Sequence, residues 1–167
     1  MASPKLLRGR LSLIGHVYSI TTVTAGRHPR FLDDGNAGAV IEAIRASDRA
    51  KRTLTLAWVV MPDHLHWLFQ LRQATLSSCL REMKAASARQ IHLQKRTHGR
   101  IWQPGYHDHA VRDHESLHGL AAYILRNPVR AGLCPHSGDY RHSWCRWPDR
   151  MDEPAHPLLP ESEAPSR

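Results

Sequence analysis

The chain has 167 residues, of which 41% are hydrophobic, which is enough for one domain with a hydrophobic core. Its mean hydropathy of −0.47, and the lack of any apolar run near ~20 residues, argue against a membrane protein. The 23 Lys and Arg residues outnumber the 15 Asp and Glu residues, so the formal net charge is +8. This excess favours a polyanionic partner.

The positive charge lies in the body of the chain. Residues 152–167 hold four acidic residues and one arginine, a formal −3, so the preceding chain carries +11 against the total of +8. We predict one domain over residues 1–147, followed by a flexible, acidic, Pro-rich tail over 148–167. The basic domain favours phosphate-backbone binding, and the alternative is a charge that serves only solubility.

The cysteines and the N-terminus predict a cytoplasmic protein. Three cysteines without Cys-x-x-Cys spacing suggest reduced thiols, and neither a disulfide framework nor a zinc ribbon. The first ten residues are basic and lack the apolar segment of a signal peptide. If the basic domain binds DNA, the expected location is cytoplasmic and nucleoid-associated.

The hydrophobic pattern predicts alternating strands and helices. Runs rich in β-branched residues or with period-two alternation predict strands, and apolar stripes at helical spacing predict helices. In chain order we predict a strand at 15–24, a helix at 36–50, strands at 53–61 and 64–71, a helix at 75–93, a strand at 106–112 and a helix from about 114 to 127. Asp113 is the predicted N-cap of the last helix.

These elements predict the fold class. The two-residue connection Pro62-Asp63 makes its flanking strands antiparallel neighbours. The order β-α-β-β-α-β-α then gives an α+β fold, a ferredoxin-like antiparallel sheet with an added C-terminal helix.

The strand after Pro62-Asp63 carries two histidines on one face. Its other face is continuously apolar and is expected to meet the core. His64 and His66 therefore lie side by side, and two neutral imidazoles at this spacing could hold one divalent metal ion. The alternative is an ordinary polar pair on a wet sheet face.

A second His-x-His pair, His107 and His109, is the rival metal site. It has no recognisable partner on a helix. We expect these two residues to face DNA or solvent.

Tyr123 and Asn127 are one turn apart on the same flank of the last predicted helix. They lie beside its buried stripe. By default, a half-exposed Tyr is a packing residue and an Asn before Pro is a helix-end residue.

Two segments together are similar to the single-tyrosine HUH transposases. They are 61–66 (MPDHLH) and 123–133 (YILRNPVRAGL). Within that class the chain most resembles the REP-associated tyrosine transposases, relatives of the IS200-like group. Residues 21–27 and 102–108 also fit the group, and the resemblance extends from about residue 17 to residue 133.

The resemblance implies a role for each matching residue. His64 and His66 would be the HUH pair that holds Mg²⁺ or Mn²⁺, with Asn127 as the third ligand. Tyr123 would be the catalytic nucleophile that attacks single-stranded hairpin DNA, giving a 5′-phosphotyrosine and a free 3′-hydroxyl. A homodimer is implied only by the resemblance.

The predicted function is therefore a metal-dependent endonuclease and strand transferase acting on hairpin-forming, REP-like single-stranded DNA. The candidates for phosphate contacts are six basic residues: Arg27, Arg81, Lys84, Arg89, Arg126 and Arg130. The alternative is a domesticated DNA-binding protein with the same fold and no turnover. A hydrolase that used the histidines to activate water would leave Tyr123 without a role.

Overall fold

The computed structural model describes residues 12–113 and 115–148. Its strands are β1 (Val17–Val23), β2 (Thr53–Val60), β3 (His64–Leu71), β4 (His107–Ala110) and β5 (Ser143–Cys145). Its α-helices are α1 (Asp34–Arg49), α2 (Leu76–Lys95), α3 (Leu117–Leu125) and α4 (Asn127–Arg130). Short 3₁₀ turns lie at Ala25–Arg27, Arg30–Leu32 and Ser137–Asp139.

The five strands form one antiparallel sheet in the order β4-β1-β3-β2-β5. The first four strands have the order and directions of a ferredoxin-like sheet, which confirms the predicted fold class. The predicted strand at 106–112 is present as the shorter β4.

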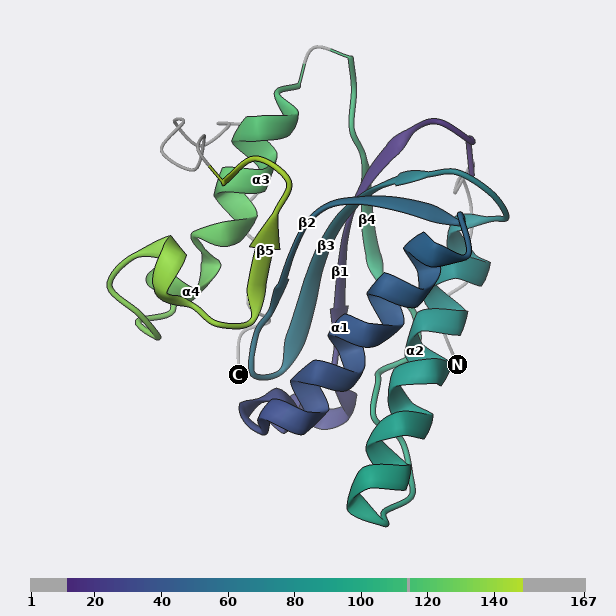
Figure 1. The fold of residues 1–167 in the computed structure, drawn as a ribbon, viewed down its shortest axis with the longest axis vertical. Helices are drawn as coiled ribbons and strands as arrows, with labels where there is room; N and C mark the ends of the chain where they lie inside the picture. Colours follow the sequence, from purple (N-terminus) through teal and green to yellow (C-terminus); the bar gives the residue numbers. More distant parts are fainter. Residues whose placement is uncertain (1–11, 114, 149–167) are drawn as a thin grey trace.

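Helices cover both faces of this sheet. α1 and α2 lie on one face, and α3 lies on the other (Figure 1). Leu65, Trp67 and Phe69 of β3 pack in the core under α1 and α2, as the alternation predicted. Leu68, on the histidine face, packs in the second core with Leu120 and other side chains of α3. The histidine face of β3 is therefore the face that α3 covers.

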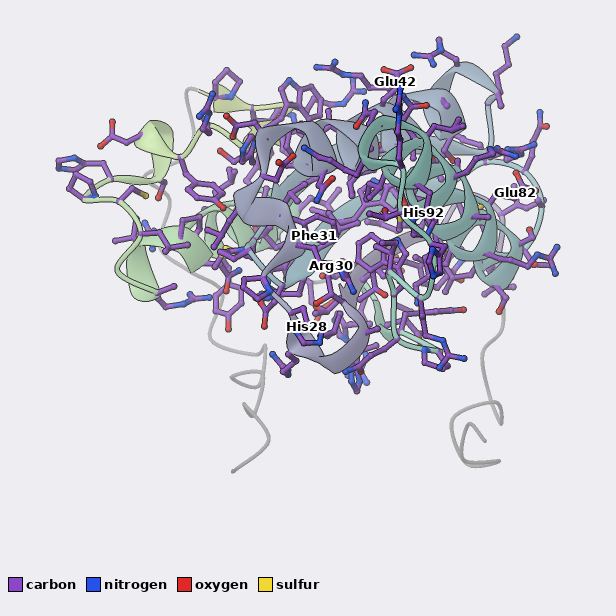
Figure 2. The ribbon with its side chains drawn as sticks, turned by 90° about the horizontal axis from the view of Figure 1, so that it is seen from below. His28, Arg30, Phe31, Glu42, Glu82 and His92 are labelled. Carbon is purple, nitrogen blue, oxygen red and sulfur yellow. The ribbon has the colours of Figure 1, made fainter. Side chains whose placement is uncertain are left out.

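Local sequence sets where the two long helices begin. Asp33 caps α1 by accepting a hydrogen bond from the Asn36 amide (3.0 Å), and Thr75 forms a capping box with Ser78 at the start of α2. Figure 2 shows Glu42 and Glu82 pointing outward from these helices, whereas Phe31 lies inside the molecule.

The predicted N-cap of the last helix is wrong. The helix begins at Leu117, and the Ser116 hydroxyl accepts the capping hydrogen bond from the Gly119 amide (3.0 Å). Asp113 lies three residues earlier, in the segment between β4 and α3. Asp and Ser are both favourable N-caps, so the local sequence does not decide between them. The predicted helix also divides, because Asn127 begins α4 and does not end α3.

β5 was not predicted. This three-residue strand pairs with the outer edge of β2, with Ala57 opposite Cys145 and Val59 opposite Ser143. The Tyr140 hydroxyl donates to the Val60 carbonyl (2.9 Å) and holds the approach to the strand. Three residues carry too little periodicity to identify a strand from sequence.

The predicted tail, residues 148–167, lies outside the described residues except for Pro148. Within the part of the chain that the structure describes, no helix has the length and apolar character needed to cross a membrane.

Candidate active site

β3 holds His64 and His66 with their rings converging. The Nε2 atoms of the two imidazoles are 3.1 Å apart, and the rings meet edge to face with centroids 4.8 Å apart. Residues two apart on a strand share a face, which explains why both rings point into the space beside α3. His66 is buried and His64 is half-buried.

Each histidine is oriented through its other ring nitrogen. The Asp63 carboxylate contacts His64 Nδ1 at 2.5 Å, and the Thr21 hydroxyl contacts His66 Nδ1 at 3.0 Å. Metal-binding histidines are usually fixed by such outer partners, which set the tautomer and the ring orientation. Sequence reasoning did not identify Thr21 or Asp63. Asp63 is adjacent to His64, whereas Thr21 reaches His66 only because β1 and β3 pair in this register.

The environment of His66 favours its neutral form. Burial, followed by the nearby His64 and the Arg130 cation, lowers the pKa of His66 from 6.5 to about 3. The ring therefore has an unprotonated nitrogen at neutral pH, as a metal ligand requires.

The pair fits a divalent metal ion. Two nitrogens that bind one ion at about 2.1 Å from neighbouring coordination positions lie about 3 Å apart, close to the separation seen here. Because Asp63 accepts from His64 Nδ1, a neutral His64 leaves its Nε2 free to accept from His66. A bound cation would take the place of the proton between the two Nε2 atoms. The Thr21 hydroxyl suits either state of His66, because it can donate a hydrogen bond to Nδ1 or accept one from it. Within residues 12–113 and 115–148, no cluster of three or more His, Cys, Asp or Glu side chains forms a metal site.

Arg130 contacts Tyr123 and Asn127 and acts electrostatically on His66. Its guanidinium carbon lies 4.1 Å from the centroid of the Tyr123 ring, and its charge acts on His66. It also donates to Asn127 Oδ1 at 2.8 Å, while Asn127 Nδ2 donates to the Ile124 carbonyl at 2.9 Å. The structure thus brings Tyr123, Asn127 and Arg130 together, with the Asn127 oxygen bonded to Arg130. Sequence reasoning included Arg130 only as a phosphate contact.

The other predicted basic residues are dispersed. Arg27 forms an ion pair with Asp63 (3.2 Å), the carboxylate that orients His64. Lys84 donates to the carbonyls of Gln103 and Gly105, and burial lowers its pKa to about 8. Arg81 and Arg89 are exposed on α2. Arg126 lies between α3 and α4 and is half-buried.

The rival pair lies on β4. Thr21 is opposite both His66 and His107, so His107 shares the sheet face of the first pair, two strands away. His109 Nε2 instead contacts the Glu115 carboxylate at 2.9 Å, and Glu115 also accepts from the Arg112 amide at 2.8 Å. His109 thus fastens the segment that leads to α3.

The chain has relatives among known proteins. The family described as Transposase IS200 like matches residues 12–127. The chain is 33% identical over 89 residues to the REP-associated tyrosine transposase of Escherichia coli (strain K12), a match that covers 52% of this chain and 51% of that protein. The chain thus spans about half the length of the curated relatives it matches.

A solved structure of a REP-associated tyrosine transposase bound to a REP hairpin superposes with a TM-score of 0.67 at 27% identity. The superposition covers 80% of this chain and 79% of that one. The family match covers more than half of the chain and includes the histidine pair, Tyr123 and Asn127. The chain belongs to the IS200-like transposase family.

Proposed function

We propose that this protein cuts and rejoins single-stranded DNA next to REP-like hairpins, through a covalent bond to Tyr123. The observation that carries this proposal is the contact of Arg130 with the Tyr123 ring beside the converging Nε2 atoms of His64 and His66. The similarity to a transposase bound to a REP hairpin supports the choice of DNA.

In the proposed reaction, Tyr123 Oη attacks the phosphorus of a DNA phosphodiester. The new bond joins the phenol oxygen to phosphorus, and the bond to the 3′-oxygen breaks. The products are a 5′-phosphotyrosine and a 3′-hydroxyl, so the phenolic proton is lost and the leaving oxygen gains one. A later attack by a 3′-hydroxyl on the phosphotyrosine reverses these steps and seals the strand without an external energy source.

His64, His66 and Asn127 are the residues that would hold Mg²⁺ or Mn²⁺. A bound divalent ion polarises the phosphate and neutralises part of its charge in the transition state. Asp63 and Thr21 hold the two imidazoles in position. Asn127 would have to exchange its hydrogen bond with Arg130 for the ion. Arg130 would then be available to a phosphate, which a guanidinium binds through two parallel hydrogen bonds.

Six basic residues are the proposed phosphate contacts: Arg27, Arg81, Lys84, Arg89, Arg126 and Arg130. They lie in the 3₁₀ turn that follows β1, on α2, at the α3–α4 junction and at the end of α4. Arg27 has an additional role in this proposal, because its ion pair with Asp63 links phosphate binding to the partner of His64.

The test is incubation of the full chain with a hairpin-bearing DNA strand and Mn²⁺, followed by denaturing electrophoresis. The wild-type protein should form a covalent adduct with DNA, and Tyr123→Phe should form none while still binding the hairpin. Tyr140→Phe, which changes another half-buried tyrosine, is the matched control and should retain the adduct. An adduct that persists in Tyr123→Phe would contradict the proposed nucleophile.

The metal requirement is tested separately. His64→Ala and His66→Ala should each eliminate the adduct, because the ion loses a ligand. Adduct formation that is undiminished in EDTA would rule out the metal. Hairpin binding without an adduct under all conditions would favour the DNA-binding alternative.

A further inference from the structure

A groove lies between α2 and the segment 99–106 that leads to β4. It encloses about 500 Å³. α2 contributes Ser77, Arg81, Ala85 and Ala88, and the segment contributes Arg100 and Tyr106, among others. We call this space the α2 groove. It lies on the side of the sheet that α1 and α2 cover, opposite α3.

The sequence of α2 explains why the groove is open. The helix buries one stripe against the sheet core, which includes Met83, Ser87 and Ile91. A second stripe at spacings of four, four and three residues faces the segment: Ser77, Arg81, Ala85 and Ala88. The two alanines of this stripe leave room between helix and segment.

Hydrogen bonds keep the wall of the groove in place. Lys84 Nζ donates to the Gln103 carbonyl (2.9 Å) and to the Gly105 carbonyl, and Trp102 Nε1 donates to the Ser87 hydroxyl (3.0 Å). The Tyr106 hydroxyl contacts the Ser77 hydroxyl at 3.0 Å across the groove. A wall fixed at several points does not collapse into the groove, so little ordering is required when a ligand binds.

The lining combines positive charge with apolar surface. In the described part of the chain, the exposed guanidinium groups of Arg81 and Arg100 make no ion pair or hydrogen bond. The methyl groups of Ala85 and Ala88 and the half-buried ring of Tyr106 supply accessible apolar surface beside them. Guanidinium groups bind phosphates, and aromatic and apolar side chains accept the face of a base. An unpaired nucleotide has both a phosphate and an accessible base face.

The groove lies at the same end of the sheet as the histidine pair. The Gln103 amide donates to the Val23 carbonyl (2.9 Å), and Val23 is the β1 residue opposite His64. Segment, β1 and β3 are thus neighbours at this end of the sheet, and two strand spacings amount to about 10 Å. The histidines and the groove lie on opposite faces of the sheet, so the single-stranded segment passes around this end of the sheet to reach both.

We propose that the α2 groove binds an unpaired nucleotide of the single-stranded segment that adjoins the hairpin. The phosphate lies on Arg81 and Arg100, and the base lies against Ala85 and Tyr106. This proposal rests on the proposed function, because it assigns to the groove a part of the same DNA substrate.

The test compares two DNA probes in EDTA, so that binding is measured without cleavage. One probe is a bare hairpin, and the other is the same hairpin with a single-stranded extension. For the wild-type chain, fluorescence anisotropy should show that the extended probe binds more tightly. Arg81→Ala and Arg100→Ala should each reduce this advantage by about tenfold, with little effect on the bare hairpin.

Arg45→Ala is the matched control, because Arg45 is an exposed arginine on α1, outside the groove. It should leave the advantage of the extension unchanged. Equal weakening of both probes by Arg81→Ala would overturn the proposal, as would no weakening or an extension that adds no affinity. Absence of a covalent adduct in metal would refute the proposed reaction and leave this binding result standing.

Discussion

At the scale of single residues, Arg130 occupies the centre of the candidate site. It lies over the Tyr123 ring, donates to the Asn127 oxygen and acts electrostatically on His66. A cation beside a divalent ion weakens the binding of that ion. In addition, Arg130 donates a hydrogen bond to the Asn127 oxygen. In the proposed reaction, Arg130 would therefore oppose metal binding until a phosphate attracts it.

This arrangement predicts opposite effects of one substitution. Arg130→Ala should bind Mn²⁺ more tightly than the wild type in the absence of DNA, by about threefold to tenfold at low salt. It should also form less covalent adduct, because a phosphate contact is lost. Calorimetric titration with Mn²⁺ measures the first effect, and an unchanged or weaker affinity would contradict it.

Asn127→Ala decides whether the amide is a ligand. The single variant should remain folded and bind hairpin DNA, yet need more Mn²⁺ for half-maximal adduct formation. In the Asn127→Ala background, Arg130→Ala should raise the Mn²⁺ affinity less than it does in the wild type, because no oxygen is released. Equal gains in both backgrounds would leave a two-histidine centre completed by water and phosphate.

The burial of His66 predicts a pH dependence of stability. Between pH 6.5 and about 3 the unfolded chain protonates this residue and the folded chain does not, so the free energy of unfolding falls as pH falls. His66→Gln should remove this contribution, worth at most about 1.4 kcal/mol per pH unit. Urea unfolding in EDTA from pH 4 to pH 6 measures both slopes. Identical slopes for the two proteins would show that His66 is protonated in the fold.

At the scale of elements, the short helix α3 positions Tyr123, the proposed nucleophile. It has nine residues, and its buried side includes Leu120 and Ile124. Isolated helices of this length are marginal, so the packing and the cap must hold it. Ser116 supplies the cap, and the contact of His109 with Glu115 fixes the segment before it.

The N-cap of α3, Ser116, gives a stability prediction for which Asp113 serves as the control. Ser116→Ala should lower the free energy of unfolding by about 1 kcal/mol, because the Gly119 amide loses its acceptor. Asp113→Ala, the cap expected from sequence alone, should have little effect. Equal destabilisation by both variants, measured by urea unfolding, would mean that the segment between β4 and α3 has another arrangement.

At the scale of the whole molecule, the charge of +11 before residue 152 predicts salt-dependent DNA binding. Each phosphate contact contributes about −0.7 to the slope of log affinity against log salt for single strands, so six contacts give about −4. Single Ala variants of the six candidates should each reduce the slope by about 0.7. Arg49→Ala, which breaks an ion pair with Glu42 on α1, should not. A flat response of the wild type would show that the charge serves solubility.

The sequence by itself determined the first four strands of the sheet, its two long helices and the pairing of His64 with His66. These features are local: alternation along β3 fixes a face, and a two-residue turn fixes an antiparallel neighbour. The proximity of Tyr123 and Asn127 was also expected from their spacing of four residues, although the structure places them in two helices, α3 and α4.

The tertiary structure alone decided what surrounds these residues. Thr21 is far from His66 in sequence and reaches it through the register of β1 and β3. Arg130 meets Tyr123 because α3 and α4 are separate helices with a junction at Arg126. β5 forms because β2 has an edge with which it can pair. The α2 groove exists because Lys84 holds the segment 99–106 in place, apart from Ala85 and Ala88 of α2. Each of these contacts joins residues distant in sequence or depends on how one element ends. Local periodicity predicts neither.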